Sequence, residues 1–325
     1  MFEEPSGMSR GEIMNKTEPA CGNALNRREL LRLLGVGGAF AAAPALGKIV
    51  REGKPQRADV FIVGPALMAE GSGQSAQLPP ASDLKMVGLI GGTAWYSTVD
   101  YYRYINEAVN DAYGNNTNPP LLLYNMNNAK IQELQAKGQW DEIASLFSQA
   151  AARLRAGGAQ AILFCANTSH KVYPQVARTL DVPILHIGDA TGVAIRTSGL
   201  KKVGLIGTKY TMEDGFMVDW LKGHYGIETL LPSSAAARQE LQRIIHEELD
   251  TGIYKPESKN YVFEQMEELR KRGAQAVVLA CTEFPLIIKQ RDFALPVFDT
   301  TRLHSQMAVD FILGKQGLAH VRPDQ

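Results

Sequence analysis

The chain has 325 residues, and its 34 Lys and Arg balance 34 Asp and Glu, so the formal net charge is zero. The length predicts one large or two modest domains, and a composition that is 45% hydrophobic and 21% charged excludes wholesale disorder. Zero net charge without a basic run excludes the electrostatic footprint of a nucleic-acid-binding protein. Three scattered cysteines, Cys21, Cys165 and Cys281, are too few for a disulfide framework or a zinc site, so we expect no metal and only free-thiol chemistry.

The N-terminal part differs in composition from the rest and is set apart from the predicted fold. Paired arginines at 27–28 precede a weakly apolar, glycine-rich stretch, and the small residues at 43–45 (APA) suit a cleavage site. The stretch is shorter than the roughly 20 apolar residues of a membrane-spanning helix. Residues 1–47 are therefore similar to a twin-arginine export signal, which predicts a periplasmic mature protein with no membrane association. The alternative is an ordinary N-terminal helix in a cytoplasmic protein, and residues 48–84 are interpreted as a linker.

From residue 85 onward, apolar runs typical of buried strands alternate with helical patterns. Strands are predicted at 86–92, 121–124 and 161–164, and helices at 101–113 and 140–156. The apolar residues at 161–164 leave no polar face, which is typical of parallel strands buried on both sides. Alternating strands and helices of this kind predict an α/β fold with doubly wound parallel sheets.

An internal repeat organises this region. Residues 87–91 (VGLIG) recur 116 positions later, residues 158–163 (GAQAIL) recur 115 positions later as GAQAVV, and residues 182–185 (VPIL) recur 113 positions later as LPVF. Buried parallel strands resemble one another, but three ordered matches at nearly constant spacing favour a duplication. We predict two pseudosymmetric lobes, formed by residues 85–185 plus 300–314 and by residues 186–299. Ligands of such sheets bind beyond the carboxyl ends of the strands, which places the site in the cleft between the lobes.

The repeat compares the two strand ends at which cysteines stand. At an offset of 115, Ala166 corresponds to Cys281. Successive strand residues point to opposite faces, so Cys165 is predicted to face the core if Ala166 faces the cleft. Free cysteines are among the most buried residues, which suits Cys165. For Cys281 we favour a functional role over a structural one, because Thr282 and Glu283 place polar groups beside a thiol at a strand end.

Three short motifs carry a resemblance to a known family. They are GG at 91–92 followed by WYST at 95–98, NTSH at 167–170 and CTE at 281–283. Together they resemble the aspartate/glutamate racemase superfamily, and most of all its bacterial aspartate/glutamate racemases, from about residue 85 to 314. The resemblance implies two lobes, a homodimer, no cofactor, and two cysteines that remove and return the substrate α-proton on opposite faces.

Such chemistry sets demands on the site. A carbanion beside a carboxylate needs hydrogen-bond donors aimed at its developing charge. The thiolate must be available near neutral pH, below the pKa of roughly 8.5 of a free cysteine. Backbone amides following Thr168 and Thr282 are expected to help with both tasks.

Ala166 is a departure from the family pattern, because the family's first cysteine stands directly before Asn-Thr. Cys165 lies one residue too early, and a shift of one residue on a strand reverses the side. By the resemblance, the missing cysteine serves the face of the D-enantiomer and Cys281 that of the L-enantiomer. We therefore expect Cys281 to deprotonate L-aspartate or L-glutamate, with the opposite proton coming from water or not at all, so that racemisation is slow, biased toward the L-substrate or absent.

The resemblance also implies a set of substrate-binding residues around Cys281. This set is Thr93, Gln135, Ala166, Asn167, Thr168, Arg238, Thr282 and Glu283. Asn167 and Thr168 would donate to the α-carboxylate, and Arg238 would meet the acidic side chain. Structural roles stay open for some members, since Arg238 also suits a solvated charge at the start of a helix.

Two other functions of the protein stay open. A decarboxylase or isomerase of the same superfamily can work with one cysteine, because one proton donor suffices. A periplasmic amino-acid-binding protein that has lost half of its chemistry would also fit Ala166. The motifs at 95–98 and 167–170 favour the racemase over both.

Overall fold

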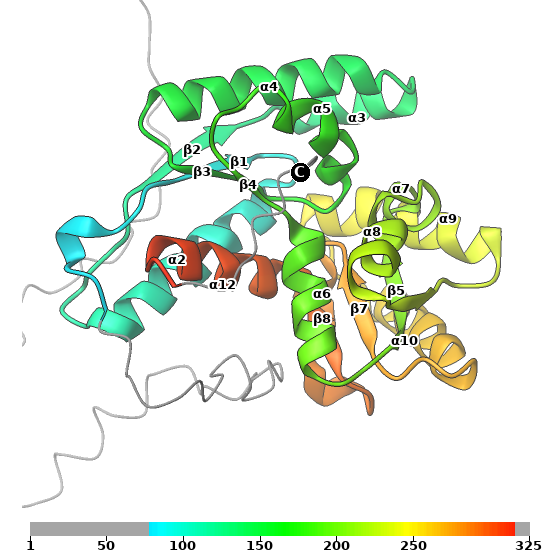
Figure 1. Ribbon diagram of the computed structural model, residues 1–325. Coiled ribbons are helices and arrows are strands. Elements are labelled where there is room, and N and C mark those ends of the chain that lie inside the picture. Colours follow the sequence, from blue (N-terminus) through cyan, green and yellow to red (C-terminus); the bar gives the residue numbers. More distant parts are fainter. Residues whose placement is uncertain (1–77, 316–325) are drawn as a thin grey trace, which may run out of the picture. The chain divides into compact units, whose positions relative to one another are not determined.

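A computed structural model describes residues 78–315 of the protein (Figure 1). The predicted export signal at 1–47 and nearly all of the predicted linker lie outside the described residues. Within the described part, none of the helices is long and apolar enough to cross a membrane.

The first lobe is built on a four-stranded parallel sheet in the order β2-β1-β3-β4. Its strands are β1 (Val87–Gly91), β2 (Leu121–Asn125), β3 (Ala161–Phe164) and β4 (Ile184–Leu185). Both β1 and β3 are buried along their whole length, as their continuous apolar runs predict.

Helices cover both faces of this sheet (Figure 1). They are α2 (Trp95–Tyr113), α3 (Asn128–Ala136), α4 (Trp140–Ala156) and α5 (Tyr173–Ala177), with a 3-10 turn η3 (Thr168–Val172). Alternate side chains of β3 enter different clusters: Ile162 and Phe164 pack with α3 and α4, while Leu163 packs with α2. This alternation follows from the two-residue period of a strand.

The second lobe repeats the same sheet in the order β6-β5-β7-β8, again parallel throughout. Its strands are β5 (Lys202–Gly207), β6 (Glu228–Leu230), β7 (Val277–Ala280) and β8 (Val297–Asp299). The repeated motifs fall on equivalent strands of the two sheets. The predicted α/β fold with two parallel-sheet lobes is therefore confirmed.

The second lobe carries more irregular helical segments than the first. Its elements are α6 (Ile187–Thr197), α7 (Lys209–Glu213), α8 (Phe216–Tyr225), α9 (Ala235–Arg243), η4 (Ile244–Glu248), η5 (Leu249–Thr251), α10 (Pro256–Lys271), α11 (Phe284–Ile287) and η6 (Gln290–Asp292). The final helix, α12 (Thr300–Ile312), packs against both α2 and α6. One hydrophobic cluster includes core residues of both sheets, such as Val87 and Val203.

Two boundaries differ from the sequence prediction. The helix predicted to begin at residue 101 begins at Trp95, because the Ser97 and Thr98 hydroxyls donate to the Ala94 carbonyl and hold the first turn. The end of the predicted linker is already packed on the first lobe. Leu84 is buried, and the Tyr113 hydroxyl donates to the Pro79 carbonyl over 2.7 Å.

Candidate active site

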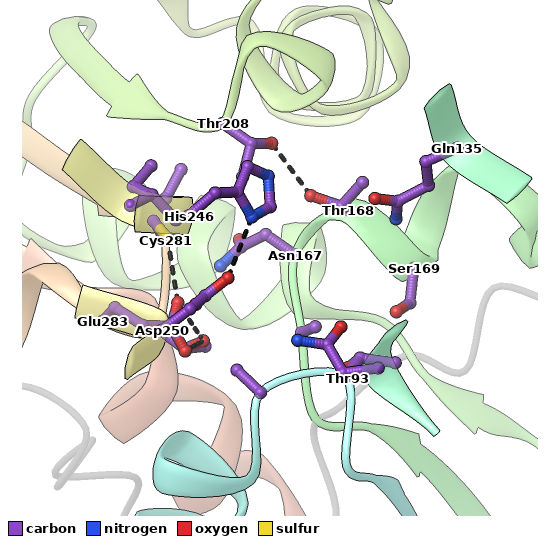
Figure 2. Close-up of a pocket in the computed structure, with 16 residues that line it drawn as sticks. Thr93, Gln135, Asn167, Thr168, Ser169, Thr208, His246, Asp250, Cys281 and Glu283 are labelled. Atoms are coloured by element: carbon purple, nitrogen blue, oxygen red, sulfur yellow. Dashed lines mark hydrogen bonds and ion pairs between the residues drawn. The ribbon is translucent and has the colours of Figure 1, made fainter. Parts of the chain in front are cut away.

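A pocket lies where the carboxyl ends of strands from both sheets meet (Figure 2). This is where open parallel sheets bind their ligands. The lining residues are Thr93, Ala94, Asn128, Gln135, Ala166, Asn167, Thr168, Ser169, Thr208, Ile245, His246, Asp250, Ala280, Cys281, Thr282 and Glu283. The structure thus brings Cys281 together with every predicted substrate-binding residue except Arg238.

The first lobe contributes unpartnered polar atoms to this pocket. Gly92 has a φ of 81°, and its backbone N–H donates to the Thr98 hydroxyl over 2.9 Å, which turns the chain after β1 and presents Thr93. Among the described residues, the buried Thr93 Oγ1 and Asn167 Oδ1 have no hydrogen-bond partner. The Asn167 amide nitrogen donates to Thr300 Oγ1 over 3.0 Å, so its oxygen is left for a ligand. Buried polar atoms without a partner are rare and point to a binding role.

A group of threonine hydroxyls connects the two lobes at the pocket. Thr168, which follows β3, has its Oγ1 2.9 Å from Thr208 Oγ1, which follows β5. Thr211 Oγ1 lies 3.3 Å from Thr168 Oγ1 and 3.0 Å from Thr208 Oγ1. Because each hydroxyl both donates and accepts, this group can orient a donor toward a bound carboxylate.

Ala166 and Cys165 lie on opposite sides of the end of β3. Ala166 lines the pocket, while Cys165 is fully buried in the core, where burial raises the pKa of its thiol far above the ordinary value. His170 holds this turn, because its Nδ1 donates to the Ala166 carbonyl over 3.0 Å and its Nε2 accepts from the Ile187 N–H over 3.2 Å. The first lobe therefore presents a methyl group where the second presents a thiol.

Cys281, directly after β7, is paired with a carboxyl group. Its Sγ donates to Glu283 Oε2 over 2.9 Å, and the Thr282 hydroxyl donates to Glu283 Oε1, also over 2.9 Å (Figure 2). Burial, together with the nearby charge of Asp250, raises the pKa of Glu283 to about 7, although hydrogen bonds from Cys281, Thr282 and Ser97 oppose the rise. A buried carboxyl group that titrates near neutrality can accept or return a proton under ordinary conditions.

The thiol itself differs from the expectation of a thiolate stabilised in the free protein. Burial, and then the charge of Glu283, raise the pKa of Cys281 well above the ordinary value, and this outweighs the favourable hydrogen bond from the Glu283 backbone. The short helix α11 that follows does not reverse this balance. Without a ligand, Cys281 is therefore a thiol whose proton is directed at Glu283.

An imidazole and a second carboxylate line the same pocket. His246 Nδ1 lies 2.9 Å from Asp250 Oδ2, and the Gln132 side-chain amide from α3 donates to the same oxygen over 3.2 Å. Gln132 Nε2 also lies 3.0 Å from His246 Nδ1, so the three side chains form one polar cluster in which Asp250 Oδ2 is shared. No described residue hydrogen-bonds His246 Nε2. Sequence analysis missed both residues, although an imidazole and a carboxylate four positions apart in a helical segment were a usable signal.

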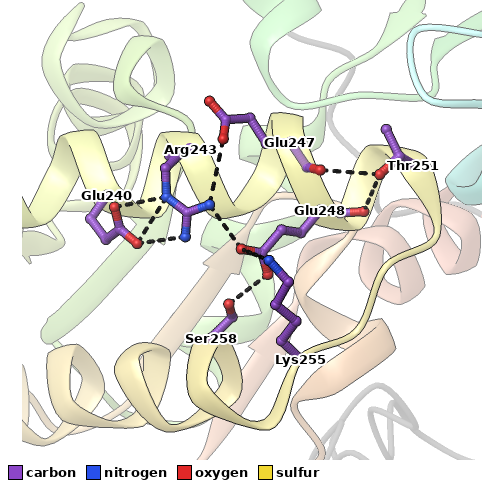
Figure 3. A network of polar contacts seen from close by, with 7 residues as sticks. All are labelled: Glu240, Arg243, Glu247, Glu248, Thr251, Lys255 and Ser258. Atoms are coloured by element: carbon purple, nitrogen blue, oxygen red, sulfur yellow. Dashed lines mark hydrogen bonds and ion pairs between the residues drawn. The ribbon is translucent and has the colours of Figure 1, made fainter.

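An ionic network around the buried Glu248 holds the segment that carries His246 and Asp250 (Figure 3). Glu248, between them in sequence, has a side chain that is 2% exposed and accepts from Arg243 over 2.8 Å and from Lys255 over 3.2 Å. The Ser258 hydroxyl donates to its other oxygen. Burial opposes ionisation of Glu248, but these hydrogen bonds prevail and lower its pKa. The segment thus has a fixed anchor in the protein core.

Arg238 lies outside the pocket, which corrects its predicted place among the substrate-binding residues. Its guanidinium Nε donates to Glu213 over 2.6 Å, and an Nη donates to the Pro232 carbonyl over 2.7 Å. It does not line the pocket, because α9 directs it toward the loop before the helix and toward α7.

Among the residues that line the pocket in the described part of the chain, none is Lys or Arg. Within residues 78–315 there is also no group of three or more His, Cys, Asp or Glu placed to hold a metal ion.

Comparisons with known protein families and with solved structures point to the same family. The pattern of the Asp/Glu/hydantoin racemase family matches residues 90–308. The crystal structure of a Yersinia pestis protein assigned as an Asp/Glu racemase is 41% identical, covers 71% of this chain and 100% of its own, and superposes with a TM-score of 0.66. An aspartate racemase homologue from Pyrococcus horikoshii is 35% identical, covers 70% of this chain and 99% of its own, and has a TM-score of 0.62.

Curated relatives match at lower identity. The broad specificity amino-acid racemase RacX of Bacillus subtilis is 22% identical over 237 residues, which is 71% of this chain and 100% of that protein. A glutamate racemase from Histophilus somni is 28% identical over 137 residues, which is 42% of this chain and 49% of that protein. The chain therefore spans about half the length of the first curated glutamate racemases that it matches.

Proposed function

The chain belongs to the Asp/Glu/hydantoin racemase family, and from this we propose that it is a cofactor-independent amino-acid racemase whose base is Cys281. The observation that supports this most directly is the 2.9 Å hydrogen bond from the Cys281 thiol to Glu283 inside the pocket. A thiol with an adjacent carboxylate acceptor has a route to its reactive thiolate form. The names of the relatives suggest aspartate, glutamate or a broader range of amino acids as substrates.

In the proposed first step, Glu283 takes the proton of the Cys281 thiol, and the resulting thiolate removes the α-proton of the L-enantiomer. The electron pair of the broken C–H bond moves into the α-carboxyl group, which gains enolate-like charge. Burial and the negative charge of Glu283 oppose ionisation of Cys281 in the empty pocket, and the substrate ammonium group offsets that charge. Binding of the substrate thus favours the reactive form.

Donors in the first lobe would stabilise the charge on the α-carboxyl group. Thr168 is oriented by Thr208, and Thr93 has a buried hydroxyl without a protein partner. Asn167 Oδ1 is an acceptor only, so it suits the substrate ammonium group. Fixed donors of this kind stabilise a developing oxyanion without reorganising during the reaction.

The second step is the asymmetric one, because Ala166 has no exchangeable proton. A water molecule on the Ala166 side would protonate the carbanion to give the D-enantiomer, while Cys281 would return a proton to the L-face. Return to the L-face is then faster than inversion. Once the proton on Cys281 has exchanged with solvent, this return replaces the α-proton with retention, so exchange exceeds racemisation. Ala166 is also compatible with the decarboxylase alternative, because that reaction needs only one proton donor.

Chiral chromatography of incubated amino acids tests the proposal. Wild-type protein should convert L- to D-enantiomer, Cys281→Ala should not, and Cys165→Ala, the matched control at the buried core thiol, should retain conversion. Conversion that survives in Cys281→Ala would overturn the assignment of the base. Loss of carbon dioxide from a substrate with two carboxyl groups on one carbon, without any enantiomer interconversion, would favour the decarboxylase.

Export and assembly are separate proposals. We propose that residues 1–47 direct twin-arginine export to the periplasm, which fractionation of cells expressing the full chain would test.

We also propose a homodimer. It is supported by Trp95, Val99 and Tyr102, which form an exposed apolar stripe along α2 and are each more than half exposed. Light scattering should give twice the chain mass, and Tyr102→Glu should reduce it.

A further inference from the structure

The charges that line the pocket are unbalanced. Its ionisable side chains are Cys281, Glu283, Asp250 and His246, so two carboxyl groups and a thiol face one imidazole. Two cations that do not line the pocket are engaged elsewhere: Arg238 is paired with Glu213 over 2.6 Å, and Lys171, three residues after Thr168, with Asp214 over 2.6 Å. A substrate with a carboxylate side chain would therefore enter a pocket without a Lys or Arg to receive it.

A second observation, independent of the charges, is that two buried polar atoms of this pocket have no partner among the described residues. Asn167 is 3% exposed, yet its Oδ1 has no partner among the described residues. Thr93 Oγ1 is buried and unpartnered in the same way. Desolvated polar atoms without partners are costly, and a bound ligand would satisfy them.

One carboxylate oxygen of Asp250, Oδ1, accepts no hydrogen bond from the described residues. Its side chain is 9% exposed, and both His246 and Gln132 bind the same atom, Oδ2. Glu248, two residues before Asp250, is held by Arg243 and Lys255 (Figure 3), and Asp250 Oδ2 is itself held by His246 (Figure 2).

The α-carboxylate and α-ammonium groups of a bound amino acid can both find partners other than the Asp250 carboxylate. The α-carboxylate suits the hydroxyl donors of the first lobe, and the α-ammonium suits Asn167 Oδ1 and Glu283. Asp250 then has one counter-charge, that of His246, and only while the imidazole is protonated. A side-chain carboxylate would add a further anion next to Asp250 and Glu283, whereas a side-chain cation would supply the missing charge.

We infer that the substrate of this pocket is an amino acid with a cationic side chain, such as lysine or ornithine, and that Asp250 binds the side-chain ammonium group. This inference rests on the proposed racemase function and changes the substrate class that the resemblance implies. Asp250 is a binding residue in this account, and Cys281 remains the base.

Paired substrates with the same carbon skeleton separate the effect of charge from that of the rest of the side chain. Proton NMR in D2O measures loss of the α-proton for L-lysine against L-norleucine, which lacks only the amine, and for L-glutamate against L-glutamine. We expect kcat/KM for lysine to exceed that for norleucine by at least about tenfold, and glutamate to be slower than glutamine. Faster exchange of glutamate than of glutamine would overturn the inference.

Variants test the assignment to Asp250. Asp250→Asn should bring the lysine-to-norleucine ratio close to one, and Asp250→Lys should make glutamate faster than glutamine. Glu247→Gln, an exposed acidic control in the same segment, should leave both ratios unchanged. Unchanged ratios in Asp250→Asn would contradict the inference while leaving the racemase intact. Absence of Cys281-dependent exchange with all four amino acids would instead overturn the proposed function and this inference with it.

Discussion

Cys281 and Glu283 share a buried hydrogen bond of 2.9 Å between Sγ and Oε2, and the carboxyl group in this pair titrates near neutral pH. The pair combines a nucleophilic atom with its own proton acceptor two residues away. The equivalent place in the first lobe holds Ala166. The asymmetry between the lobes, more than the fold itself, determines the chemistry we propose.

Glu283 should govern the pH dependence of activity. Its pKa is raised to about 7, and only the ionised form accepts the proton of the thiol. In wild-type protein, kcat/KM for α-proton exchange should therefore rise as the pH increases through about 7. Glu283→Gln should lower kcat/KM on the order of 100-fold at pH 8 and remove this limb. A limb that persists unchanged in Glu283→Gln would assign the titration to another group.

Ala166→Cys should restore symmetry to the pocket. A thiol on the face opposite Cys281 supplies the base that acts on the D-enantiomer, so exchange starting from that enantiomer should accelerate on the order of 100-fold. Ala166→Ser is the matched control, since its hydroxyl has nearly the same size but is a far weaker acid. Equal rates from the D-enantiomer in the cysteine variant and the wild type would show that Ala166 is not the cause of the bias.

Buried histidines should make the fold sensitive to mild acid. Burial lowers the pKa of His170 to about 4, and it also lowers the pKa values of His186 and His304. In the unfolded chain these groups titrate near 6.5, so below that pH the unfolded state binds more protons. Stability is fully present above pH 6.5 and falls as the pH drops toward 4.

His170 alone contributes a slope of about 1.4 kcal/mol per pH unit across this window. Urea unfolding at several pH values between 7 and 4.5 measures the combined slope. His224→Gln, a control at an exposed ring, should retain it. A free energy of unfolding that stays flat between pH 7 and 5 would contradict the account of these histidines as neutral core residues.

Glu248 should support the pocket from a distance. Glu248→Ala removes the buried carboxylate that accepts from Arg243, Lys255 and Ser258, and loss of these hydrogen bonds should cost about 2 kcal/mol of unfolding free energy. Because the same segment carries His246 and Asp250, KM should rise more than kcat falls. Glu240→Gln, at the exposed end of the Arg243 network, should have a much smaller effect. Similar losses in both variants would argue against a special role for the buried carboxylate.

Much of the fold could be predicted from the sequence because the duplication leaves a regular signal. Apolar strands buried on both faces recur at a spacing of 115 or 116, and they fall on β1 and β5 and on β3 and β7. The same offset aligned Ala166 with Cys281. Strand periodicity then placed Cys165 in the core, which its complete burial confirms.

The rest of the site depends on contacts that no local pattern encodes. His246 and Asp250 lie in the irregular segment η4–η5, where Glu248 pairs with Arg243 and Lys255 and where no regular periodicity predicts which side chains face the pocket. Thr208 follows a strand of the second lobe and meets Thr168 of the first. Arg238 was wrongly placed because its charge was visible in the sequence but its partner Glu213 was not.

Deuterium incorporation at the α-carbon, followed separately from each enantiomer, tests the central claim most directly. The account predicts that the L-enantiomer of a turned-over amino acid gains α-deuterium faster than the D-enantiomer forms, and that both processes vanish in Cys281→Ala. Exchange that proceeds equally from the two enantiomers, or that continues without the Cys281 thiol, would contradict a one-sided base at this position.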